Sequence, residues 1–267
     1  MRNFQTRTYK DRDGYLVTSE KDGGDTAFFT GHYFIGLWLK MPYMREHYGN
    51  FFKKKLSELE VPGHKGNYRR HPKKGWASEP DRMSRDQMTP LIIAMGFYGF
   101  TDSLNWFTLR WLTRFMFMTN TRRNGATKEN HGTNGRDYSF KLPDFSPTFS
   151  GLLIRAYKIK LLYPILFILD LELLLGAIKN IYWASESGDD HNFIARLFQA
   201  EESFPTPISS VATKLYGKRK QMKHQKVFDY KTNSHPQRAI QHYAARGNFK
   251  YPPLDVLFKS MVESKWP

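Results

Sequence analysis

The chain has 267 residues and a formal net charge of +16, from 41 Lys and Arg against 25 Asp and Glu. Hydrophobic residues make up 40% of it and aromatic residues 16%, which is too much apolar material for a disordered chain. The absence of cysteine excludes disulfides, thiolate metal ligands and thiol nucleophiles. Such a length suits one large domain or two small ones.

The first 24 residues are polar, and we expect them to form an extended N-terminal arm. Asp and Gly residues typical of turns flank the segment 15–18, with sequence Tyr-Leu-Val-Thr, which predicts one short strand. The arm begins without the apolar core that a signal peptide needs.

From residue 25 onward the spacing of apolar residues predicts helices that come in pairs. Residues 27–39 are apolar nearly all round, so this helix is expected to be enclosed, whereas residues 43–59 carry a single apolar stripe typical of an outer helix. The alternation recurs in the expected helices 84–95, 101–118, 149–183 (broken at Pro164), 190–200 and 208–216. Residues 119–148 form a polar segment without clear periodicity.

The predicted fold is all-α, a curved array of about four helical hairpins over residues 25–217. Residues 218–267 are expected to form a basic, loop-rich tail with a terminal helix from Pro253. The most apolar stretch, residues 161–178, is interrupted by Pro164, Asp170 and Glu172. Because a spanning helix needs about 20 mostly apolar residues, we expect this stretch and residues 87–101 to be buried helices and no membrane span to be present.

Three helix starts carry residues typical of N-caps. Asp25 and Thr206 each precede an apolar helical pattern, and Pro207 follows Thr206 as a first-turn proline. The segment 84–87, Ser-Arg-Asp-Gln, has the form of a capping box, in which the Ser84 hydroxyl and the Gln87 side chain satisfy each other's backbone amides.

Several short motifs extend over residues 11–260: Asp22-Gly23-Gly24-Asp25-Thr26-Ala27, Thr30-Gly31, Arg70-His71-Pro72, Ser84-Arg85-Asp86-Gln87 with Pro90-Leu91-Ile92, Pro205-Thr206-Pro207 and Pro252-Pro253-Leu254. With these motifs the chain resembles a group of uncharacterised bacterial and tailed-phage proteins. The pattern of motifs in these proteins is similar to that of the (α/α) toroids of glycan-active proteins. In those toroids, loops at the N-termini of the inner helices form a cleft. The resemblance implies a helical-hairpin architecture, although a full toroid has six hairpins and about four are expected here.

Charged residues gather where two of the expected inner helices begin, and a titratable group there can act as acid or base while a guanidinium neutralises an anion. The candidate catalytic residues are His71, Asp25 and Asp86, and the candidate substrate-binding residues are Arg70, Arg85, Tyr68 and Trp76. The competing interpretation is structural: Asp25, Ser84 and Asp86 cap helices and Arg85 holds a loop by an ion pair.

Other clusters point to no metal or cofactor. Asp170 and Glu172 lie about 200° apart on one helix, so ion pairs in the core are favoured over a catalytic pair. Residues 9–20 resemble a calcium loop only in part, and the nine His residues show no zinc-ligand spacing.

Two basic clusters favour a polyanionic partner. The candidate contacts are Lys65, Lys73, Lys74, Lys218, Arg219, Lys220 and Lys223. Basic residues interleaved with aromatic ones suit a nucleic acid backbone or an acidic polysaccharide, although a solvated basic surface also keeps a protein in solution.

Three functions therefore stay open. The first is a phage-type helical toroid that interacts with an acidic glycan through a lyase-like or hydrolase-like site. The second is a non-enzymatic structural or accessory component of a phage particle, which contacts DNA, acidic partner subunits or other virion proteins. The third is a cytosolic polyanion-binding module. The sequence alone does not separate binding from catalysis.

Overall fold

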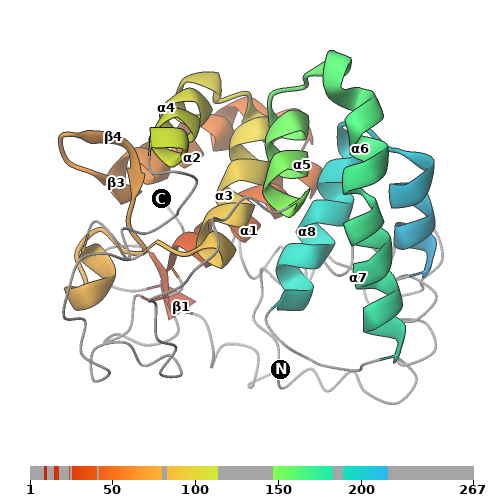
Figure 1. Ribbon diagram of the computed structural model, residues 1–267. Helices are drawn as coiled ribbons and strands as arrows, with labels where there is room; N and C mark the ends of the chain where they lie inside the picture. The colour runs from red at the N-terminus through yellow and green to blue at the C-terminus, as the bar shows by residue number, and fades with distance from the viewer. Residues whose placement is uncertain are drawn as a thin grey trace.

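A computed structural model describes residues 9–10, 15–17, 24, 26–40, 42–79, 83–113, 147–182 and 189–215. This part of the chain is mostly helical, which confirms the coarse fold class (Figure 1). Most of the N-terminal arm, nearly all of the polar segment 119–148 and the whole basic tail 218–267 with its expected terminal helix lie outside the described residues.

The expected helices are present, with bounds that differ by a few residues. They are α1 (Thr26–Lys40), α2 (Arg45–Leu59), α3 (Arg85–Tyr98), α4 (Thr101–Thr113), α5 (Pro147–Ala156), α6 (Tyr163–Leu169), α7 (Leu171–Tyr182) and α8 (Asp189–Glu202). Residues 207–215 are also helical. Short 3-10 turns cover Pro42–Met44 (η1), Gly75–Ser78 (η2) and Lys160–Leu162 (η5). A toroidal arrangement of these helices stays a prediction.

In the described part of the chain, four short strands accompany the helices. Strands β1 (Tyr9–Lys10) and β2 (Leu16–Val17) pair antiparallel, and β2 coincides with the strand expected in the arm. Strands β3 (Glu60–Val61) and β4 (His64–Tyr68) form an antiparallel hairpin that the sequence analysis did not predict. Its turn contains Pro62 and Gly63, and Gly63 has a φ of 74°, a backbone conformation that glycine adopts without strain.

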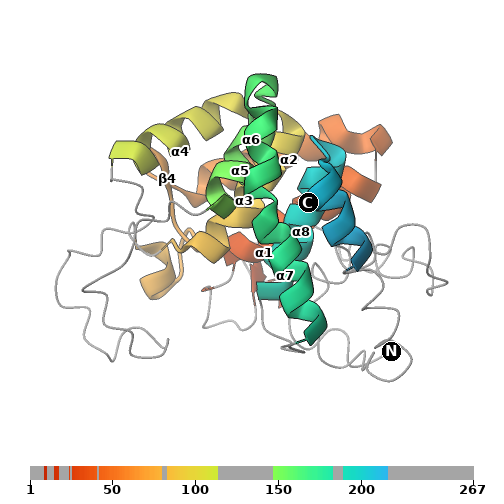
Figure 2. The same cartoon turned by 45° about the vertical axis from the view of Figure 1, so that its right-hand side comes forward.

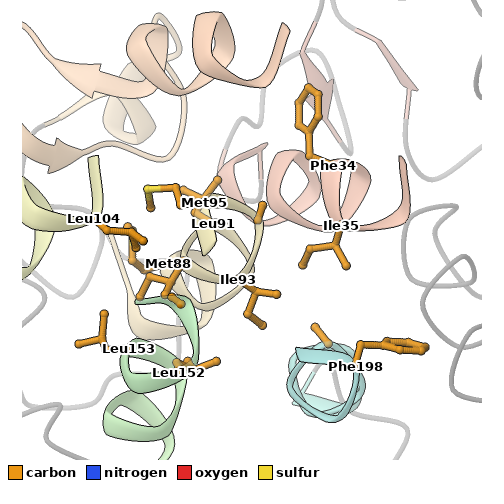
Figure 3. Packing of buried hydrophobic residues seen from close by; sticks show 14 of the residues in the cluster. Phe34, Ile35, Met88, Leu91, Ile93, Met95, Leu104, Leu152, Leu153 and Phe198 are labelled. Carbon is orange, nitrogen blue, oxygen red and sulfur yellow. The ribbon is translucent and has the colours of Figure 1, made fainter. Parts of the chain in front are cut away.

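The hydrophobic core is built around α3. In Figure 1, α1, α4, α5 and α8 lie around this helix, and Figure 3 shows side chains from all five helices meeting there. Every residue from Leu91 to Met95 is 0% exposed. Gly31 of α1 lies directly on α3, where an added Cβ would come within 2.6 Å of the carbonyl carbon of Pro90. The close approach of α1 and α3 at this crossing therefore requires a glycine, which has no side chain.

The expected difference between inner and outer helices is confirmed. Residues 26–37 of α1 and 87–96 of α3 are all buried. In α2, by contrast, the buried residues are Gly49, Phe52, Lys55, Leu56 and Leu59, which recur every three to four residues and define one face. Helix α2 packs on α1 through aromatic rings, with the ring centroids of Phe34 and Phe52 4.6 Å apart.

Two expectations for residues 149–183 are wrong. The helical region does break, but at residues 157–162; Pro164 lies in the first turn of α6, where its missing amide costs no hydrogen bond. The stretch 161–178 is not a buried helix. Among the described residues, one helix, Lys160–Ile178, is long and apolar enough to cross a membrane, and only 22% of it is buried.

Candidate functional site

The segments that hold the predicted site do meet at the start of α1. The Arg70 guanidinium donates a hydrogen bond to the Gly24 carbonyl oxygen at 3.2 Å, and the Arg70 carbonyl accepts one from the Ala27 amide at 3.0 Å. From the start of α3, the Gln87 side-chain oxygen accepts a hydrogen bond from the Phe28 amide at 3.0 Å. Two of the amides that a helix N-terminus offers to an anion are thus already occupied by protein acceptors.

The capping box expected at residues 84–87 is absent. Ser84 does occupy the N-cap position of α3, with extended backbone angles, but its side chain makes no capping hydrogen bond. The Gln87 side chain bonds to α1 instead of returning to Ser84. Gln87, one of the two residues that predict a capping box here, joins α3 to α1 instead. Asp25, the other predicted cap in this region, lies outside the described residues.

His71 is enclosed in the loop that follows β4. It is 0% exposed, and its Nδ1 atom accepts hydrogen bonds from the backbone amides of Lys73 and Lys74 at 3.0 and 3.1 Å. Its own amide donates to the Ala77 carbonyl at 3.0 Å. An Nδ1 atom that accepts two amide hydrogen bonds carries no proton, so a neutral His71 holds its proton on Nε2. In this position His71 organises the loop, and its role as acid or base stays a prediction.

A polar cluster that the sequence analysis missed lies beside His71. The Tyr15 ring packs edge-on against the imidazole with ring centroids 5.0 Å apart, and the Tyr15 hydroxyl donates a hydrogen bond to Glu58 of α2. The Lys55 ammonium lies 3.1 Å from a Glu58 carboxylate oxygen and 4.0 Å from the centroid of the Tyr15 ring. No spacing in the sequence connects residues 15, 55–58 and 71, because only the tertiary fold brings them together.

The environment of Glu58 favours its charged form. Burial alone would raise the pKa of this carboxyl group, but hydrogen bonds from Tyr15 and Lys55 and the charges of Lys55 and Lys54 outweigh it. The net effect is a pKa below the usual value. Glu58 therefore stays ionised at neutral pH and is already neutralised by its neighbours.

The other predicted site residues lie on β4, η2 and α3. Arg85 is exposed in the first turn of α3, while Tyr68 is only 3% exposed. Burial, reinforced by the charge of Glu60, raises the pKa of Tyr68 against an opposing hydrogen bond with Ser103. Asp86 lies in α3 and Trp76 in η2, and the described structure places their backbones only.

The β3–β4 hairpin and the segments on either side of it are rich in basic residues. Residues 53–74 contain eight Lys and Arg against two Glu. Glu58 is held by Tyr15 and Lys55, and Glu60 accepts a hydrogen bond from the Gly66 amide at 2.6 Å. The segment after the hairpin returns to the end of α2, since the Arg69 amide donates to the Leu59 carbonyl at 2.9 Å. We call the exposed side chains Lys53, Lys54, His64, Lys65, Lys73 and Trp106 the hairpin surface.

An aromatic ring completes this surface. The side chain of Trp106, on α4, is 45% exposed, and the Lys65 ammonium lies 5.5 Å from its ring centroid. The geometry is held by Gly66, where an added Cβ would come within 2.3 Å of the Trp106 carbonyl oxygen. The backbones of β4 and α4 are thus in direct contact at Gly66. This close packing fixes the position of the Lys65 ammonium relative to the Trp106 ring.

A second polar cluster is buried where α5 meets the junction of α6 and α7. The Arg155 guanidinium lies 2.7 Å from a carboxylate oxygen of Asp170, and the two residues are 3% and 1% exposed. Thr206 donates its hydroxyl to the same oxygen at 2.6 Å and caps the following helix, accepting the Ser209 amide at 3.0 Å. The predicted core ion pair of Asp170 and the predicted Thr206 cap are both confirmed.

Glu172 is paired as well, with Arg196 of α8 at 3.1 Å. Burial lowers the pKa of Arg196, and the Glu172 charge opposes that shift. A cavity of about 10 Å³ lies between these residues and Gln199, which leaves room for about one water molecule and none for a substrate. Across the described ranges, no group of three or more His, Asp or Glu residues could hold a metal ion.

Comparisons with known proteins add no assignment. No protein-family model, curated protein or solved structure matches the chain. The resemblance to bacterial and tailed-phage proteins stays an expectation from the short motifs. The lysines and arginine of the tail, Lys218, Arg219, Lys220 and Lys223, lie outside the described residues.

Proposed function

We propose that this protein binds a polyanionic polymer, an acidic polysaccharide or a nucleic acid, through the hairpin surface. The observation that supports the proposal most is the contact between Lys65 and the exposed Trp106 ring, 5.5 Å apart, on a rigid hairpin. A cation beside an aromatic plane suits a polymer that alternates anionic groups with flat rings, because the ammonium attracts the anion while the ring stacks.

The charge balance of the surface supports the same proposal. Both carboxylates of residues 53–74 are engaged by protein donors, so little opposes the field of the lysines around them. Binding, rather than turnover, is the function that this geometry favours, since His71, the candidate acid or base, is 0% exposed and its Nδ1 accepts hydrogen bonds from two backbone amides.

The test measures binding of the full chain to a polyuronate, to single-stranded DNA and to double-stranded DNA at several salt concentrations. We expect affinity to fall as salt rises, and the variant Lys53→Gln/Lys65→Gln to lower the slope of log affinity against log salt by about one for each lysine in contact. The matched control is Lys158→Gln/Lys160→Gln, which removes two exposed lysines far along the chain.

Trp106→Ala separates stacking from charge. If the ring stacks on the polymer, its loss weakens binding by about 1–3 kcal/mol at every salt concentration and leaves the salt slope unchanged. An equal loss in the lysine control, or binding that does not respond to salt, would show that the hairpin surface is not the contact. Preference among the three polymers identifies the natural class of partner.

A further inference from the structure

The helix formed by α6 and α7 presents an unusually apolar face to its surroundings. The two helices run on from each other, because the Asp170 amide bonds to the Leu166 carbonyl at 2.8 Å and the Leu174 amide to the Asp170 carbonyl at 3.0 Å. Figure 2 shows them in line at the front of the molecule, with α5 and α8 behind. We call α6 and α7 together the α6–α7 rod. The large exposed hydrophobic side chains on it and on the preceding η5 turn are Leu161, Ile165, Phe167, Ile168, Leu171, Leu175 and Ile178.

These side chains cover a broad arc. At about 100° per residue, the exposed apolar positions fall within an arc of about 160°, with Phe167 at one edge and Ile165 at the other. Glu172 falls inside this arc, next to the Ile165 edge. Residues 161–178 extend about 26 Å along the helix axis. The most exposed are Leu161 at 87%, Ile168 at 70% and Leu175 at 65%. The seam that one partner helix covers is narrower than this arc, whereas a continuous apolar medium covers all of it.

Both carboxylates that interrupt the apolar sequence are paired with arginines of neighbouring helices, although only Asp170 is buried and the Glu172 side chain is 37% exposed. Asp170 is 1% exposed and bonds to Arg155 and Thr206, and Glu172 is paired with Arg196. Ionisable residues in membrane-facing helices are usually paired in this way. The exposed residues Lys158 and Lys160 stand at the N-terminal end of the face, where a cation can reach lipid headgroups.

We propose that this face, residues 161–178 of η5, α6 and α7, inserts into the surface of an anionic lipid bilayer. The helix lies in the plane of the interface, with its protein side held against α5 and α8 and its apolar arc among the acyl chains. Charge favours this occupant over a second copy of the chain, because Lys158 and Lys160 at the N-terminal end of the face are attracted to anionic headgroups and not to their counterparts in a second copy. Within residues 161–205 seven acidic residues stand against two basic ones, so the attraction comes from these flanking lysines and from the rest of the chain, which brings the net charge of the whole to +16.

The first experiment is flotation of the full chain with vesicles of phosphatidylcholine and phosphatidylglycerol, compared with phosphatidylcholine alone. We expect binding to the anionic vesicles, and a loss of about 100-fold in the partition constant for Ile168→Gln/Leu175→Gln, since each aliphatic side chain contributes at least about tenfold. The control is Leu109→Gln/Val211→Gln, in which two side chains 53% and 47% exposed are changed on other helices. Because all four residues are exposed, their melting temperatures should match the parent.

The second experiment places a probe on the face. The chain has no cysteine, so Ile168→Cys and Val211→Cys each carry one environment-sensitive fluorophore at a single site. Emission at position 168 should shift to the blue when anionic vesicles are added, and emission at position 211 should not. The Lys53→Gln/Lys65→Gln variant should keep that shift, which separates insertion of α6–α7 from attraction of the hairpin surface to lipid.

Four results would overturn the proposal. They are no vesicle binding, equal loss in the Leu109→Gln/Val211→Gln control, blue-shifted emission at position 168 before vesicles are added, and a parent dimer in light scattering that Ile168→Gln/Leu175→Gln converts to monomer without any vesicle binding. The third result would mean that another part of the chain covers the face. The fourth would assign it to a second copy.

Discussion

Helix α3 and the α6–α7 rod are both rich in apolar residues, yet they occupy opposite environments. In α3 every residue from Leu91 to Met95 is 0% exposed, whereas Ile168 and Leu175 of the rod are 70% and 65% exposed. The difference lies in what surrounds each helix. Helix α3 has neighbours on several sides (Figures 1 and 2). Among its described side chains, the rod is buried only along the side that carries Leu166, Asp170, Leu173 and Ala177. Apolar composition thus predicts a helix but not its burial.

The largest effect is expected from removing the buried carboxylate that joins the α6–α7 rod to α5. Asp170→Ala leaves the Arg155 guanidinium buried without its carboxylate, and we expect a loss of roughly 3–5 kcal/mol in the free energy of unfolding. Urea denaturation measures this loss. The double variant Arg155→Leu/Asp170→Leu should recover most of it, because a buried pair replaced by apolar residues costs little. Failure of the double variant to recover would show that Asp170 acts through Thr206 instead.

The next prediction contrasts the two helices directly. Leu91→Ala removes a fully enclosed side chain and should lower the free energy of unfolding by roughly 2–5 kcal/mol. Ile168→Ala removes an exposed one and should change it by no more than about 0.5 kcal/mol. Both values come from the same denaturation experiment without lipid. Similar losses at the two positions would mean that the face at residue 168 is covered in solution.

A smaller effect tests how α3 is joined to α1. Gln87→Ala removes the side chain that accepts the Phe28 amide, and we expect a loss of about 1 kcal/mol, as for other helix caps. Ser84→Ala should cost only a few tenths, because the Ser84 hydroxyl makes no capping hydrogen bond. Melting temperatures of the two variants give the comparison. A larger loss of stability for Ser84→Ala than for Gln87→Ala would support the capping box that the sequence predicts.

The smallest effect concerns pH. Because the folded-state pKa of Glu58 is lowered, its ionised form stabilises the protein above the unfolded-state pKa, and this contribution is lost as the pH falls through the folded-state value. Glu58→Gln should therefore flatten the decline of stability in acid, measured by urea unfolding from neutral pH downward. Glu46→Gln, at an exposed position in the first turn of α2, is the control. An unchanged acid profile in Glu58→Gln would contradict the assigned partners.

Local patterns predicted the local parts of this fold. Helical spacing placed the helices, the one-sided stripe identified α2 as the outer helix, and Thr206-Pro207 marked a helix start that is capped as expected. The hairpin was missed because its strands are short, although Pro62-Gly63 is a recognisable turn signal.

What the sequence did not reveal depends on contacts between distant residues. Nothing in Arg70-His71-Pro72 indicates that the imidazole is enclosed by the loop that follows it, or that Tyr15 and Glu58 lie beside it. Nor does the periodicity of residues 161–178 tell how many sides of that helix have neighbours. A residue type suited to chemistry and the same type used to hold a loop look alike until the fold is known.

The hydrogen bond from Phe28 to Gln87 has a consequence for the order of folding. It joins residues 59 positions apart, so the first turn of α1 gains its acceptor only after α3 has docked. Closing such a separation is slow compared with forming a helix turn, and α1 should therefore gain its final protection late. In the native state the Phe28 amide should exchange with solvent only in openings that also release α3. The two helices would then open and close as one cooperative unit.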